Sequence, residues 1–114
     1  RIERIAEAVT ARLPLSTLVL GMGEDRHIAS LFPGSPELAE ALSPSAPVVV
    51  EVTAPGQPEP RVSLSLPVLR DAMNIHLVML GQPKREAFES SKGLPADLAP
   101  VRAIADNATV HWAE

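Results

Sequence analysis

Two short apolar runs, each ended by a glycine, are the feature of this sequence that most limits its possible folds. Residues 17–20 (TLVL) precede Gly21, and residues 75–80 (IHLVML) precede Gly81. Each run is too short for a globular helix and shows no alternation of apolar and polar residues, which predicts strands buried on both faces, as in a parallel sheet. Twelve prolines among 114 residues disfavour a bundle of long helices.

The opening stretch predicts a helix ahead of the first of these strands. Residues 1–13 carry Ile2, Ile5 and Val9 at helical spacing, and Pro14 ends the pattern, so we expect an amphipathic helix packed against a core. Helix, buried strand and glycine turn in this order are typical of an α/β fold. We therefore predict one α/β domain over residues 1–114.

The remaining pattern predicts short elements separated by turns. Ser35 is a candidate N-cap for a helix that starts at Pro36. In chain order we expect helical turns over 27–32 and 36–42, a strand over 48–52, a loop over 55–60, a strand over 62–66, helical turns over 67–72, a helix over 83–91, and short strands over 101–104 and 109–112.

Composition excludes several classes of protein. The chain is 46% hydrophobic and 21% charged, which is sufficient for a packed core. A formal net charge of -4 without a Lys/Arg cluster argues against a nucleic-acid or membrane partner, and no apolar run reaches the roughly 20 residues of a membrane span. The absence of cysteine excludes disulfides and thiolate metal sites and fits a cytoplasmic protein. Three scattered histidines predict no metal site.

The densest group of reactive side chains follows the first strand, in the segment GMGEDRHIASLFP over residues 21–33. Ligands of open α/β sheets bind at the carboxyl ends of strands, and Gly21 and Gly23 would let the backbone approach one. Glu24, Asp25 and His27 combine two carboxylates with an imidazole, which can act as a general base near neutral pH. Residue types alone leave a solvated acidic loop as the alternative.

The segment as a whole resembles the GxGxDGHTASLFP signature of the 6-phosphogluconolactonase family. The resemblance continues through RVSLSLPVL at residues 61–69 and GQPKREA at residues 81–87, and then through residues 94–96 and 110–112. These blocks follow the order of the family across nearly the whole chain.

The resemblance implies a Rossmann-like (NagB/RpiA-like) layered fold with a parallel sheet. It also implies hydrolysis of 6-phospho-D-glucono-1,5-lactone to 6-phospho-D-gluconate in the oxidative pentose phosphate pathway, without a cofactor. His27 would be the general base, Asp25 and Glu24 would orient or polarise the site, and Arg61 and Lys84 would bind the substrate phosphate, as cationic side chains do.

Two residues depart from the signature of the family. Arg26 stands where the family has Gly, and Ile28 stands where it has Thr. A positive φ at Arg26 would cost about 1 kcal/mol, although its guanidinium could add a phosphate or carboxylate contact.

Lactone hydrolysis also needs a hydrogen-bond donor to the developing oxyanion, and the backbone N–H of Gly23 is a candidate.

Two alternatives to a lactonase stay open. The related glucosamine-6-phosphate deaminases resemble this chain at His27 and Ile28, but they carry an acid where Phe32 stands here, which favours the lactonase. The second alternative is a module that binds sugar phosphates without turnover.

The resemblance covers the carboxy-terminal half of the family pattern, and the sequence begins with Arg1 instead of Met. We therefore expect the carboxy-terminal part of a longer lactonase, whose partner is the missing amino-terminal half. A parallel sheet divided in its middle would expose an unpaired edge and an apolar face.

Overall fold

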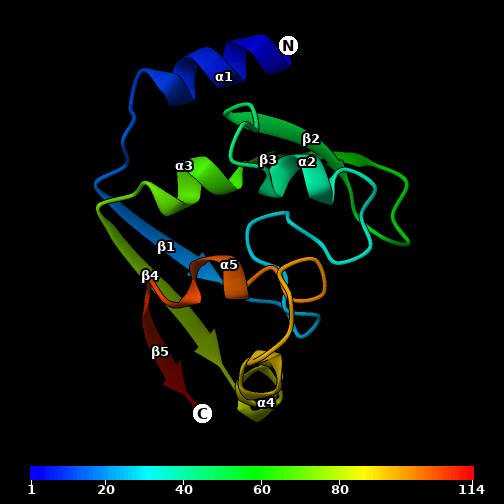
Figure 1. Cartoon of the computed structure of the whole chain (residues 1–114), viewed down its shortest axis with the longest axis vertical. Coiled ribbons are helices and arrows are strands. Elements are labelled where there is room, and N and C mark those ends of the chain that lie inside the picture. Colours follow the sequence, from blue (N-terminus) through cyan, green and yellow to red (C-terminus); the bar gives the residue numbers. More distant parts are fainter.

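The computed structural model describes all 114 residues and contains two sheets (Figure 1). The larger sheet holds Thr17–Gly21 (β1), Asn74–Leu80 (β4) and Thr109–Ala113 (β5), all parallel and in the order β1-β4-β5. The smaller sheet is an antiparallel pair of Val49–Thr53 (β2) and Pro60–Leu64 (β3). The α/β fold with a parallel sheet is confirmed, whereas the separate antiparallel hairpin was not predicted.

Five helices accompany the strands. They are α1 (Ile2–Thr10), α2 (Leu38–Leu42), α3 (Leu66–Arg70), α4 (Gln82–Ser91) and α5 (Arg102–Ala105). Helix α1 precedes β1, and the other four lie in the connections between strands. Figure 1 shows α1 beside the β2–β3 hairpin at one end of the molecule and α4 at the other end, near the carboxyl end of β4. None of the helices combines the length and the apolar character that a membrane crossing requires.

One face of the parallel sheet carries the hydrophobic core. Leu20, Ile75 and Leu77 lie on this face and are 7%, 4% and 0% exposed. They belong to one apolar cluster with Leu69 of α3 and Ile104 of α5. Burying a side chain of this size contributes about 1.5–3 kcal/mol, so this face holds the helices on the sheet.

The opposite face of the parallel sheet is uncovered. Val19, Val78 and Leu80 lie on it and are 65%, 40% and 63% exposed. His76 and His111 share this open face, with Nδ1 of the first 3.0 Å from Nε2 of the second. The prediction that both strands are buried on both faces is therefore wrong for this chain, because a local apolar run does not specify whether a second layer covers the strand. The exposed apolar face agrees instead with the expectation of a sheet divided in its middle.

Most other predicted elements are present with small shifts of their ends. The strands expected over 48–52, 62–66, 75–80 and 109–112, and the helices expected over 67–72 and 83–91, correspond to β2, β3, β4, β5, α3 and α4. The first helix ends at Thr10, and none of its residues is buried. Helix α2 begins at Leu38 with Glu37, not Ser35, at the N-cap.

Two predicted elements are wrong. The strand expected over 101–104 is a helix, α5, because Val101 and Ile104 stand one helical turn apart and both enter the core. The helical turn expected over 27–32 is a tight reversal closed by the N–H of Leu31 on the carbonyl of Ile28 (2.8 Å). A helix cannot form there because φ of Ala29 is 49°.

Candidate functional site

The chain that leaves β1 forms a tight turn over residues 23–27. The N–H of Arg26 donates to the carbonyl of Gly23 (2.9 Å), and the N–H of Gly23 donates to the carbonyl of His27 (3.1 Å). The backbone of Arg26 is left-handed, with φ of 73°. This residue lies between Asp25 and His27, so its conformation turns the two neighbours toward each other.

Asp25 holds both the backbone and the ring of His27. Its Oδ1 lies 2.5 Å from the imidazole Nδ1 and accepts the backbone N–H of His27 at 3.1 Å. Partial burial works against ionisation, but these hydrogen bonds and the charge of the imidazole outweigh it, so the pKa of Asp25 lies below its ordinary value of 3.8. An ionised carboxylate only accepts, so Nδ1 carries the hydrogen, and in the neutral form of the ring Nε2 presents a lone pair. This is the arrangement of a general base oriented by a carboxylate.

Gly23 is required because the ring of His27 occupies the place of a side chain. A Cβ on Gly23 would lie 2.2 Å from the imidazole Cε1, 2.3 Å from Nδ1 and 2.8 Å from Oδ1 of Asp25. Gly21 differs, since a Cβ there would come no closer than 4.0 Å to another atom, the carbonyl oxygen of Val78. Of the two glycines in the motif, Gly23 alone is demanded by packing.

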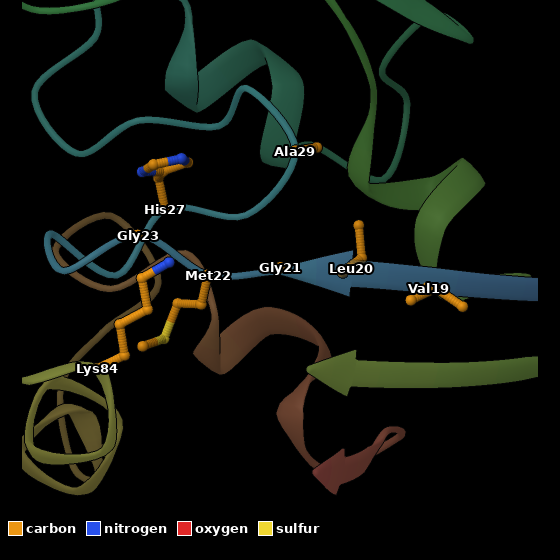
Figure 2. A pocket seen from close by; sticks show the side chains of 8 residues that line it. All are labelled: Val19, Leu20, Gly21, Met22, Gly23, His27, Ala29 and Lys84. Atoms are coloured by element: carbon orange, nitrogen blue, oxygen red, sulfur yellow. The ribbon is translucent and has the colours of Figure 1, made fainter. Parts of the chain in front are cut away.

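A hollow of about 440 Å³ lies beside this turn. Figure 2 shows Lys84 extending from α4 toward the loop that carries Gly23 and His27. The hollow is lined by Val19, Leu20, Gly21, Met22, Gly23, His27, Ala29 and Lys84. Lys84 stands in the first turn of α4, where the helix dipole also favours an anion. The hollow thus combines an imidazole with a cation, an arrangement that suits an anionic substrate attacked by water.

Three further residues named from the sequence lie outside the hollow. Arg26 directs its guanidinium to α4, as described below, and Glu24 is exposed and makes no hydrogen bond. Arg61 donates from Nη2 to Oε1 of Gln57 (2.6 Å), and its Cζ lies 5.5 Å from the centre of the Phe32 ring. The roles of Glu24 and Arg61, like those of the other site residues, stay predictions.

The backbone N–H of Gly23 is not available to an oxyanion. It already donates to the carbonyl of His27, a bond that closes the turn. The expectation that it stabilises developing negative charge is therefore wrong.

The sequence did not predict the contact between Phe32 and His27. The two ring centres are 4.6 Å apart and the planes are inclined by 42°. The reversal over residues 28–31 brings Phe32 back to the imidazole. Residues 27–32 were predicted to be helical, and residues five apart do not face each other on a helix, so the sequence gave no sign of this contact.

Comparisons with known proteins agree with the resemblance. Residues 2–112 match the family described as glucosamine-6-phosphate isomerases/6-phosphogluconolactonase. The chain is 41% identical over 105 residues to a 6-phosphogluconolactonase of Mesorhizobium japonicum, and the match covers 88% of this chain and 44% of that protein. It is 39% identical over 118 residues to a 6-phosphogluconolactonase of Rhizobium meliloti, which covers 96% of this chain and 50% of that protein.

A solved structure shares the fold. The crystal structure of a 6-phosphogluconolactonase from Shewanella baltica superposes with a TM-score of 0.91 at 28% identity, and the match covers 99% of this chain and 51% of that one. The chain spans about half the length of the relatives it matches.

Replacing Gly23 by alanine tests the packing of the imidazole. We expect Gly23→Ala to displace the ring of His27 and to lower the free energy of unfolding by about 1–3 kcal/mol, as overpacking does. Gly21→Ala is the matched control, because its methyl group meets no atom within 4.0 Å. Denaturant unfolding measures the stability, and the NMR signal of the His27 Nδ1 hydrogen reports the ring. A native Nδ1–H signal in Gly23→Ala would contradict this account.

Acid should weaken the contact between Asp25 and His27. The folded pKa of Asp25 is depressed below 3.8, so its contribution to stability is complete above that pH and is lost as the pH falls through the folded pKa. Asp25→Asn removes this contribution. We expect the difference in unfolding free energy between the two proteins to be at most about 1 kcal/mol, since solvent screens a half-exposed pair. Unfolding curves between pH 5 and pH 2 should show it shrinking, and a pH-independent difference would refute the assignment.

Proposed function

Because the chain belongs to the family of glucosamine-6-phosphate isomerases and 6-phosphogluconolactonases, we propose that it supplies the base-bearing part of a 6-phosphogluconolactonase. The reaction is the hydrolysis of 6-phospho-D-glucono-1,5-lactone to 6-phospho-D-gluconate, in the oxidative pentose phosphate pathway. The observation that carries the proposal is the pair of Asp25 and His27, joined at 2.5 Å beside a hollow that Lys84 also lines.

The first step uses the free nitrogen of His27. Nε2 takes a proton from water as the water oxygen bonds to the lactone carbonyl carbon, and the carbonyl π electrons move to the oxygen. Asp25 keeps the hydrogen on Nδ1 and stabilises the imidazolium that results. A tetrahedral intermediate is formed, and no cofactor takes part.

The second step opens the ring. The oxyanion re-forms the carbonyl, the bond between that carbon and the ring oxygen breaks, and the ring oxygen receives the proton from Nε2 of His27. The imidazole is neutral again, and the product is the open-chain acid. One base therefore serves both steps, as general base and then as general acid.

Lys84 is the residue we propose for the substrate phosphate. It borders the same hollow as His27 and is a point charge that binds phosphate well. Arg61 is a second candidate. Its guanidinium would have to leave Gln57 and pass the ring of Phe32 to reach the hollow.

The packing of Phe32 argues against a deaminase. Its ring lies against the imidazole of His27, at the position where the resemblance places the acid of the deaminases. A phenyl ring has no proton to transfer, so ring opening of an amino sugar would lack this acid.

The first test of the proposed function is acid release from fresh 6-phosphoglucono-1,5-lactone, corrected for spontaneous hydrolysis. The sample is the longest natural polypeptide that contains this chain. His27→Ala should lower kcat/KM by about 100-fold or more, as loss of a general base does, and should still bind 6-phosphogluconate. Lys84→Ala should weaken that binding.

Each other outcome points to a different function. Binding of 6-phosphogluconate by the native protein without turnover would indicate a non-catalytic module. Release of ammonia from glucosamine-6-phosphate would indicate a deaminase. Activity that survives His27→Ala would reject His27 as the base.

The partner that we propose is the remaining half of the same enzyme, covering the open face of the sheet. Two observations support it: the chain spans about half the length of its relatives, and Val19, Val78 and Leu80 are exposed together on one face. Monomeric proteins rarely leave such a face bare. The cytoplasmic location that we also propose fits a chain without cysteine.

Charge on the open face should block this association. Leu80→Asp would bury a carboxylate among apolar side chains, and we expect it to weaken binding of the complementary half by about 10-fold or more. Leu98→Asp is the matched control, since Leu98 is also exposed (55%) but lies in the connection between α4 and α5. Isothermal titration measures both. A stable monomer that does not bind the other half would refute the partner.

A further inference from the structure

The side chain of Arg26 binds α4 instead of facing the hollow. Its Nε donates to the carbonyl of Ala87 at 3.0 Å, and its Nη2 donates to Oγ of Ser90 at 2.5 Å. Ser90 is itself fixed, because its hydroxyl also lies 3.2 Å from the carbonyl of Ala87. The guanidinium thus binds two neighbouring acceptors, which belong to residues one turn apart on the same helix.

The backbone of Arg26 is held as firmly as its side chain. Its carbonyl accepts the N–H of Val101 at the start of α5 (3.1 Å), and its N–H donates to Gly23. A left-handed backbone is unfavourable for a residue with a Cβ, so these contacts hold it there. Arg26 therefore joins three segments: its own turn, α4 and the start of α5.

The contacts of Arg26 connect the turn that carries Asp25 and His27 to the helix that carries Lys84. Arg26 lies between Asp25 and His27 in the chain, and the helix it grips begins with the turn that carries Lys84. Without the hydrogen bonds of the Arg26 guanidinium, the turn with Asp25 and His27 would be free to move relative to α4 and therefore relative to Lys84.

We propose that Arg26 is a positioning residue, whose side chain fixes the pair of Asp25 and His27 relative to α4 and so sets the placement of the base against a phosphorylated substrate. This inference rests on the proposed function for its kinetic consequence. Its structural consequence, a fixed imidazole, holds without it.

Two substitutions separate the side chain from the backbone. Arg26→Gly removes the guanidinium and keeps a residue that adopts positive φ freely, whereas Arg26→Ala removes the guanidinium and keeps the strain. Arg26→Lys supplies one donor group and should restore part of the effect. Arg85→Ala is the matched control, since Arg85 is an arginine of α4 itself, and its Cζ lies 4.6 Å from the centre of the Trp112 ring.

The kinetic test is made in the longest natural polypeptide that contains this chain. We expect Arg26→Gly and Arg26→Ala to lower kcat by about 10-fold or more, because a misplaced base loses rate steeply. The dissociation constant of 6-phosphogluconate should change less than about threefold, with one molecule bound per chain, which shows that the folded fraction is intact. Arg85→Ala should leave both values unchanged.

The structural test does not depend on activity. The NMR signal of the His27 Nδ1 hydrogen should be present in the native protein and in Arg85→Ala, and it should broaden or vanish in Arg26→Gly. A native signal and a native kcat in Arg26→Gly would overturn the proposal, as would an equal loss in Arg85→Ala. If the native protein does not hydrolyse the lactone, the proposed function fails, and the Nδ1 signal alone decides the role of Arg26.

Discussion

The imidazole of His27 lies against the α-carbon of Gly23, in the volume that any larger residue would fill. The rest of the site depends on this contact. Because the ring is seated there, Nδ1 meets the carboxylate of Asp25 and Nε2 is left free, and the carbonyl of His27 returns to the N–H of Gly23 to close the turn. The absence of a side chain at residue 23 thus leaves the space in which the imidazole lies, and this space fixes the orientation of the ring.

The local sequence pattern predicted the elements whose conformation depends least on tertiary packing. Strand β4 and helix α4 follow from periodicity and from the glycine between them. The error at residues 101–104 arose because a run with Val101 and Ile104 at its ends fits either a short strand or one helical turn. The apolar run alone predicted burial of Val19, which is exposed, because a short segment does not encode whether a second layer covers the strand; the half-length match to the family did predict an exposed apolar face.

The sequence placed the candidate site residues after the carboxyl ends of adjacent parallel strands, where ligands bind in such sheets. In the structure Asp25 contacts His27, and His27 and Lys84 line one hollow, while their roles in the reaction stay predictions. Arg61 belongs to the separate hairpin, whose placement relative to the parallel sheet depends on tertiary packing. The contact of Arg26 with α4 joins residues 61 positions apart, and no motif spacing indicates it.

Val19 belongs both to the open face of the sheet and to the wall of the hollow, so a partner that covers the face would also border the hollow.

The left-handed backbone at Arg26 has a genetic consequence. Every arginine codon becomes a glycine codon by one nucleotide change, and glycine is the residue that this backbone accepts with least strain. A single nucleotide change therefore converts a turn that is hydrogen-bonded to α4 through Arg26 into a turn with a less strained backbone, and the reverse change is also a single step.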